Sequence, residues 1–90
     1  MFQKLLVNKL MEYVVIFEEG ENSCSAYVPD LPGCIAAGDT MEEASTLITE
    51  AIVFHIEGLR EYGEVVPLPS PDLLVPMDPG MLSTLVAVQV

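Results

Sequence analysis

Hydrophobic and polar residues follow a helical spacing between Thr40 and Gly63, and the rest of the chain is arranged around this stretch. Thr40 is typical of a helix N-cap, and Glu43 can complete a capping box three residues later. Arg60 suits the negative end of the helix dipole, and Gly63 can end the helix. We therefore predict one amphipathic helix over residues 40–63. Its apolar stripe is expected to contain Ala44, Leu47, Ile48, Ala51, Ile52, His55, Leu59 and Tyr62.

Three stretches before this helix have the composition of β-strands. Residues 11–19 are rich in β-branched and aromatic side chains and apolar on both faces, which is typical of a central strand. Residues 23–28 alternate between small apolar and polar side chains, and the short turn before them predicts a hairpin with the first strand. Residues 34–37 form a short third strand. Gly38 and Asp39 then turn the chain into the helix cap.

The chain after the helix contains a proline-rich segment and a final strand. Residues 65–80 hold five of the seven prolines, which excludes a helix or a central strand and indicates an extended crossover. Residues 81–90 are nearly all apolar, so this strand must be covered on both faces or shared with a second subunit. The order β-β-β-α-β predicts an α+β fold, with a mixed four-stranded sheet in the order 3-2-1-4 and one helix packed on a face. The last strand is expected to run parallel to the first, through a right-handed crossover.

The length of 90 residues corresponds to one small domain with a modest core. Oligomerisation would relieve this limit, so we expect a homo-oligomer, a dimer or a tetramer, that uses the final strand. Residues 1–10 carry two of the three basic residues and are interpreted as an N-terminal appendage to a single domain at residues 11–90. Either Met1 or Met11 could be the native start.

The charge balance is strongly acidic, with 14 Asp and Glu against 3 Lys and Arg and a net charge of -11. This argues against direct nucleic-acid binding, which requires cationic groups. It is compatible with a basic protein partner, although acidity can also serve solubility alone. No segment resembles a secretory signal or is long and apolar enough to span a bilayer, and two cysteines make no disulfide framework. We therefore predict a cytoplasmic protein.

Candidate catalytic groups are few. His55 is the single histidine and falls on the apolar stripe, which favours a packed residue over a catalytic base. Cys34 has no evident base near it in sequence and is interpreted as a small buried hydrophobe. A cluster of three acids at the end of the hairpin could collect a cation, but such acids are more often solvated. We predict no catalytic residue, no metal site and no cofactor.

The most specific pattern runs from Tyr27 to Ala44, YVPDLPGCIAAGDTMEEA. Pro29 and Pro32 fix two bends and Gly33 permits a backbone turn, which indicates a connector between strands and helix. The motifs VPDLPGC, GDT and EEA, followed by AIVFHIEGL and GEVVPLPS, resemble the HicB family of antitoxins over about residues 12–70. The resemblance implies a partial RNase-H-like fold. It also implies binding to HicA, a small basic RNA-cleaving toxin whose active site the antitoxin covers.

Many members of this family continue into a ribbon-helix-helix or helix-turn-helix domain that binds the operator. The present chain stops at Val90, so we expect a short form without direct DNA binding. An orphan oligomeric scaffold or ligand-binding protein is the main alternative. A degenerate RNase-H-like nuclease is a further one, but such catalysis needs metal-binding carboxylates and Val14 to Phe17 contain none, so no enzyme is predicted. A neighbouring gene for a small basic protein would favour the antitoxin.

The acidic residues of the helix are either a solvated face or a docking surface for the partner. In the second interpretation, rim charges steer association and an apolar centre at the turn 29–34 holds the complex. The predicted partner-binding residues are Glu50, Glu57 and Glu61 on the helix, Glu18, Glu19 and Glu21 at the hairpin end, and Tyr27, Pro29, Asp30, Leu31 and Pro32 around the turn.

Overall fold

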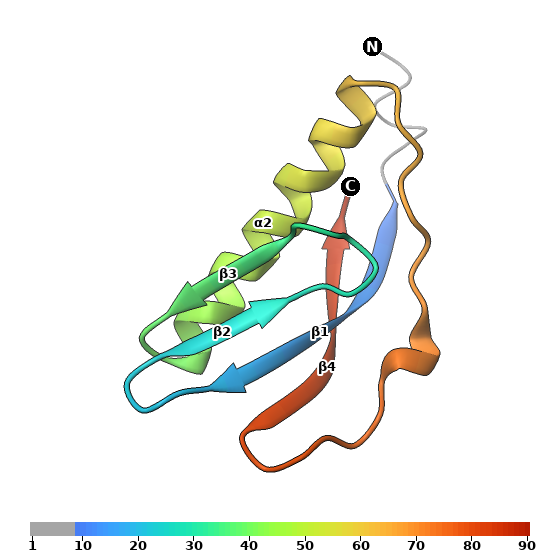
Figure 1. Ribbon diagram of the computed structural model, residues 1–90. Coiled ribbons are helices and arrows are strands. Elements are labelled where there is room, and N and C mark those ends of the chain that lie inside the picture. Colours follow the sequence, from blue (N-terminus) through green and yellow to red (C-terminus); the bar gives the residue numbers. More distant parts are fainter. Residues whose placement is uncertain (1–8) are drawn as a thin grey trace.

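The computed structural model describes residues 9–90, which form a four-stranded sheet with one long helix across one face (Figure 1). The elements are β1 (Leu10–Glu19), β2 (Cys24–Tyr27), β3 (Ile35–Gly38), α2 (Met41–Glu61), the short 3-10 helix η1 (Pro71–Leu73) and β4 (Met81–Gln89). The sheet order is β3-β2-β1-β4. The predicted α+β class, the strand order and the central place of the first strand are confirmed. Of the predicted appendage, only Lys9 and Leu10 lie inside the described residues, and Leu10 is the first residue of β1.

The predicted direction of the last strand is wrong, because β4 runs antiparallel to β1 and the sheet is antiparallel throughout rather than mixed. The Glu19 amide donates to the Gly80 carbonyl over 2.8 Å, and the Val90 amide donates to Lys9 at the other end over 2.8 Å. The helix alone returns the chain to the start of β1. The extended segment 65–80 then runs along the sheet once more, since 16 extended residues can reach about 50 Å and β1 needs only about 33 Å. Because of this second pass, β4 begins beside the end of β1 and runs back antiparallel to it.

The ends of α2 follow the predicted capping signals. The Thr40 side chain accepts a hydrogen bond from the Glu43 amide over 3.1 Å, and the Glu43 carboxylate accepts from the Asp39 amide over 2.9 Å. Gly63 has a φ of 70°, the left-handed conformation that ends many helices. The predicted helix and its capping box are therefore confirmed. No helix within residues 9–90 is long and apolar enough to cross a membrane.

The buried face of α2 differs from the predicted stripe. The fully buried positions are Ala44, Ile48, Ile52 and Ile56, each four residues after the last. Steps of four turn the buried face by about 40° each around the helix, so it drifts as α2 crosses the twisted sheet. Leu47 and Tyr62, which the spacing assigned to the stripe, are 38% and 79% exposed. The prediction placed the apolar residues on one straight line along the helix and therefore did not include Ile56.

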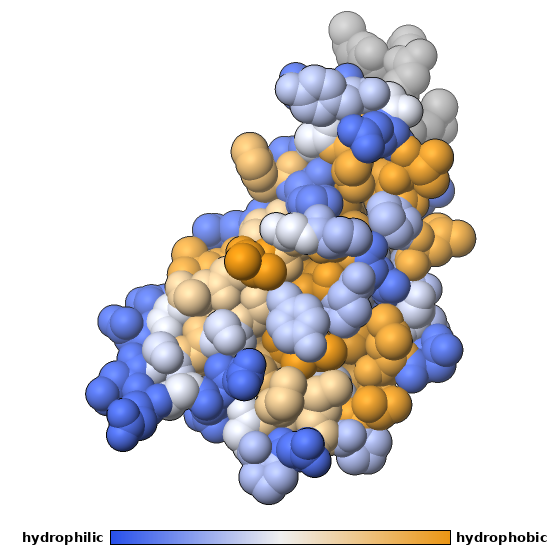
Figure 2. Space-filling view, viewed as in Figure 1, coloured by the Kyte–Doolittle hydropathy of each residue, from blue (hydrophilic) through white to orange (hydrophobic). Residues whose placement is uncertain are grey.

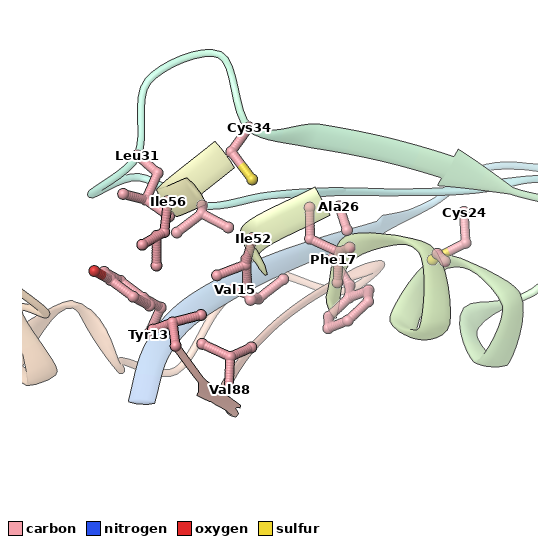
Figure 3. Close-up of a cluster of buried hydrophobic side chains, with 14 residues drawn as sticks. Tyr13, Val15, Phe17, Cys24, Ala26, Leu31, Cys34, Ile52, Ile56 and Val88 are labelled. Atoms are coloured by element: carbon pink, nitrogen blue, oxygen red, sulfur yellow. The ribbon is translucent and has the colours of Figure 1, made fainter. Parts of the chain in front are cut away.

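One hydrophobic core lies between α2 and the sheet (Figure 3). β1 contributes Tyr13, Val15 and Phe17 to it, and β2 contributes Cys24 and Ala26. In Figure 3 the two thiols, those of Cys24 and Cys34, lie well apart in this cluster, and both are free and buried. The prediction that Cys34 is a small buried residue is confirmed.

The other face of β1 carries Val14 and Ile16, which are also buried. Ser83 pairs with Ile16 in the sheet and so lies on the same face, and its hydroxyl donates to the Val75 carbonyl over 2.5 Å. The proline-rich return therefore passes over this side of β1 and β4. Covering on both faces explains the apolar run that marked the first strand as central.

Candidate partner-binding surfaces

The turn between β2 and β3 points its largest apolar side chain into the core. The Leu31 amide donates to Val28 and the Cys34 amide donates to Leu31, each over 3.0 Å, and Gly33 has a φ of 87°. This backbone closes the turn and buries Leu31 completely, beside Tyr13 and Ile56 in Figure 3. Leu31 was predicted to contact a partner, but its side chain has no exposed surface to offer. In the same turn Pro32 is exposed and Pro29 half-buried.

Asp30, another predicted partner residue, is bonded within the chain. One carboxylate oxygen accepts from the Ser70 amide over 2.7 Å and the other accepts from the Ser70 hydroxyl over 2.9 Å. Nearby, the Tyr13 hydroxyl donates to the Pro67 carbonyl over 2.6 Å. Burial raises the pKa of Tyr13, and the charge of Asp30 adds to this, whereas Arg60 lowers it. The Asp30 bonds fasten the turn to the proline-rich return and the Tyr13 bond fastens β1 to it, so Asp30 has a structural role.

Tyr27 lies on the face of the sheet that α2 does not cover. It pairs with Ile16 on one side and with Ile35 on the other, so the three side chains form a row on this face. Tyr27 is 38% exposed and Ile35 is 70% exposed. Figure 2 is viewed onto this face and shows apolar side chains across its middle. Tyr27 is therefore available to a partner, but from the side opposite to the helix.

The three predicted acids of the helix, Glu50, Glu57 and Glu61, are all exposed. Their spacing of seven and four residues puts them on one outer face, about opposite the buried face at 3.6 residues per turn. The same face carries Phe54, which is 79% exposed, and Leu47. The sequence interpretation did not single out Phe54. Its position along the helix between Glu50 and Glu57, on the side away from the predicted apolar stripe, is the signal that could have identified it.

The acids of the hairpin end, Glu18, Glu19 and Glu21, are exposed near the start of α2, because Glu19 pairs with Cys24 and Cys24 with Gly38. At a rise of 1.5 Å per residue, Glu57 and Glu61 lie about 24 to 30 Å from the start of α2 at Met41. Apart from the residues of the turn 29–32, the structure therefore separates the predicted residues into three surfaces: the outer face of α2, the hairpin end and the open sheet face around Tyr27.

Catalytic groups are scarce among the described residues. Within residues 9–90 no group of three or more His, Cys, Asp or Glu side chains could hold a metal ion. Burial raises the pKa of both thiols, Cys24 and Cys34, which disfavours the reactive thiolate. His55 is half-buried on α2. The exposed surface thus offers acidic and apolar side chains suited to binding.

Residues 13–87 match the family described as the HicB_like antitoxin of bacterial toxin–antitoxin systems. The chain is 44% identical to an uncharacterised 14.9 kDa protein of Haemophilus phage HP1 over 61 residues, and this match covers 68% of the chain. It is 37% identical over 68 residues to antitoxin HicB 2 of Photorhabdus laumondii, covering 71% of this chain. The matched region spans 46% of each of these two relatives, so the chain corresponds to about half their length.

Two solved structures share the fold. The N-terminal domain of the Burkholderia pseudomallei antitoxin HicB superposes with a TM-score of 0.72 at 32% identity, covering 89% of this chain and 100% of that domain. A chain of the HicA3 and HicB3 toxin–antitoxin complex superposes with a TM-score of 0.66 at 28% identity, covering 83% of this chain and 94% of that one. These agreements in sequence and in fold identify the family predicted from the motif. The chain belongs to the HicB-like antitoxin family of bacterial toxin–antitoxin systems.

Proposed function

We propose that this protein is an antitoxin that binds a small basic HicA-type toxin, an mRNA-cleaving protein, and covers its active site. The observation that carries the proposal is the likeness of the fold to a chain solved in a HicA–HicB complex, over 83% of this chain. The net charge of -11 supports it, because a protein that binds RNA presents cationic groups. Carboxylates of the antitoxin compete for the groups that would otherwise hold phosphates.

Electrostatics and apolar contact have separate tasks in this proposal. An exposed ion pair contributes only about 0.2 to 1 kcal/mol, so the exposed glutamates mainly steer association and select a basic partner. Apolar side chains that lose their water on binding supply most of the residence time. The protein therefore needs at least one exposed apolar group on the surface that meets the toxin.

We further propose that the chain acts by binding and not by catalysis. Nuclease chemistry of the RNase-H type holds metal ions with carboxylates from the central strand. In this chain the middle of that strand, Val14 to Phe17, is buried and apolar, and Glu18 and Glu19 lie beyond it on the surface. The proposed inhibition requires occupancy of the toxin and no reaction.

Three related proposals concern the surroundings of the protein. We place it in the cytoplasm, which the two free thiols support because disulfides are rare in reducing compartments. We propose that this chain by itself does not bind operator DNA, since its 3 basic residues stand against 14 acidic ones and leave a net charge of -11. We also propose a homo-oligomer through the outer edge of β4.

One observation favours a second function, the binding of a small apolar ligand. A cavity of about 640 Å³ lies between the start of β1 and the proline-rich return, lined by Leu10, Met11, Val66 and Leu68 among others. Lys9 and Arg60 also line this cavity. A ligand there would suit an orphan family member without a toxin.

The test begins with the neighbouring gene. If the proposal is right, a small basic HicA-type protein is encoded beside this chain, and the two copurify when they are expressed together. A neighbouring toxin that does not copurify, or the lack of any such gene, contradicts the antitoxin function and favours the ligand-binding alternative.

A further inference from the structure

Phe54 is an aromatic side chain in the middle of α2 that has no role in the core. It is 79% exposed, although burying a phenylalanine typically yields about 1.5 to 3 kcal/mol. Phenylalanine is also a poorer helix former than alanine, so the helix itself does not require it. A single exposed apolar residue is common on proteins, and its surroundings must decide whether it matters.

The surroundings of Phe54 form a stripe along the outer face of α2. Leu47, Glu50, Phe54, Glu57 and Glu61 follow one another at steps of three and four residues, so they line up on the side of the helix away from the sheet. All five are exposed. The opposite side, from Ala44 to Ile56, is fully engaged in the core. The outer stripe therefore remains available, with an apolar centre and acids on both sides of it.

We propose that this outer stripe is the surface that meets the basic toxin, and that the ring of Phe54 is its anchor. The ring enters an apolar socket or stacks on a guanidinium group of the partner, while Glu50, Glu57 and Glu61 pair with cations around it. The inference rests on the proposed antitoxin function and adds to it the docking surface. It also moves the apolar centre away from the turn 29–34, where Leu31 is buried.

Charge complementarity selects this occupant over the others. A second copy of the chain on this stripe would bring three carboxylates against three carboxylates, and like charges in contact oppose association. Nucleic acids and anionic lipid surfaces carry the same sign and are repelled. A basic protein is the partner that gains from the acids. The stripe from Leu47 to Glu61 is about 21 Å long, which suits the centre of an interface of standard size.

The experiment measures, by calorimetry, how tightly four forms of this chain bind the neighbouring HicA-type toxin: the wild type and three variants. The toxin carries a substitution at its catalytic residue so that it can be purified. Phe54→Ala removes the anchor. Tyr62→Ala is the matched control, because Tyr62 is also 79% exposed but lies off the stripe at the end of α2. Tyr27→Ala tests the open sheet face. All three positions lie outside the core, and a melting curve confirms that each variant remains folded.

We expect Phe54→Ala to weaken binding by about 30-fold, the effect of removing a hot-spot residue. Tyr62→Ala and Tyr27→Ala should change the affinity by less than about threefold, as surface substitutions away from an interface do. A Phe54→Ala affinity within threefold of the wild type overturns the inference, and so does a loss confined to Tyr27→Ala, while the antitoxin function stands in both cases. Failure of the wild-type chain to bind overturns the proposed function and the inference together.

Discussion

Replacing Leu31 with alanine tests whether the turn 29–34 belongs to the core or to a binding surface. Leu31 is fully buried and lies against Tyr13 and Ile56 (Figure 3). The turn is closed by its own backbone hydrogen bonds and held to Ser70 through Asp30, so it cannot easily collapse into the space left by the missing atoms. Leu-to-Ala changes in such rigid sites cost about 2 to 5 kcal/mol, and we expect about 3 kcal/mol here.

This cost is large for a domain of 90 residues, whose total stability is roughly 5 to 13 kcal/mol. It corresponds to a fall in the melting temperature of about 12 to 24 °C. Thermal and urea unfolding of Leu31→Ala measure it, with Pro32→Ala as the control, because Pro32 is exposed in the same turn and should change stability by about 0.5 kcal/mol or less. A Leu31→Ala variant as stable as Pro32→Ala would refute the assignment of this turn to the core.

Four further predictions follow from the surface, the edge strand and the buried hydroxyl and thiols. Changing Glu50, Glu57 and Glu61 to Lys should slow association with the toxin and make the association rate less dependent on ionic strength, because exposed charges are screened over about 10 Å at 0.1 M salt. Equal salt slopes for the wild type and the triple variant would show that these acids are only a solvated face. Light scattering should return the mass of a dimer or tetramer, because β4 is an edge strand without charged residues and its Leu82 and Leu85 side chains are exposed, by 46% and 39% respectively. A monomer mass at micromolar and higher concentration argues against this. Folding raises the pKa of three groups, the Tyr13 hydroxyl and the Cys24 and Cys34 thiols, so the unfolded chain releases these protons at a lower pH than the folded chain. Stability should therefore fall as the pH rises above about 9. A midpoint of urea unfolding that stays constant from pH 7 to 11 contradicts this. Pure protein should not cleave RNA or an RNA–DNA hybrid, and metal-dependent cleavage that disappears in Glu18→Gln or Glu19→Gln would contradict the binding-only proposal.

Local signals in the sequence were sufficient for the elements and their caps. Thr40, Glu43 and Gly63 act within a few residues of themselves, so their spacing alone fixes where α2 begins and ends. The apolar run in β1 likewise reports burial on both faces. These features depend on neighbours along the chain, which a sequence displays directly.

Features that depend on distant parts of the chain were harder to predict. The prolines of segment 65–80 indicate extended backbone but not how far it travels, and this distance decided the direction of β4. The drift of the buried face toward Ile56 follows from the angle between α2 and the sheet. Leu31 stands among turn residues in the sequence, and only the closed backbone of the turn directs its side chain inward.

The candidate site shows the same division. Its acids could be assigned to the outer face of α2 from their spacing, and Glu50, Glu57 and Glu61 are indeed exposed there. The apolar centre was expected at the turn 29–34 together with Tyr27. The sheet places Tyr27 on the opposite side of the domain from those acids, and the exposed Phe54 among them was not predicted.

In the proposed function, this chain neutralises a HicA-type toxin by occupying its active site. The direct measurement is cleavage of an RNA substrate by the neighbouring toxin as purified antitoxin is added. We expect cleavage to fall in proportion to the added antitoxin and to end when all toxin is bound. Added RNA should compete with the antitoxin for the toxin. Undiminished cleavage at saturating antitoxin would contradict it.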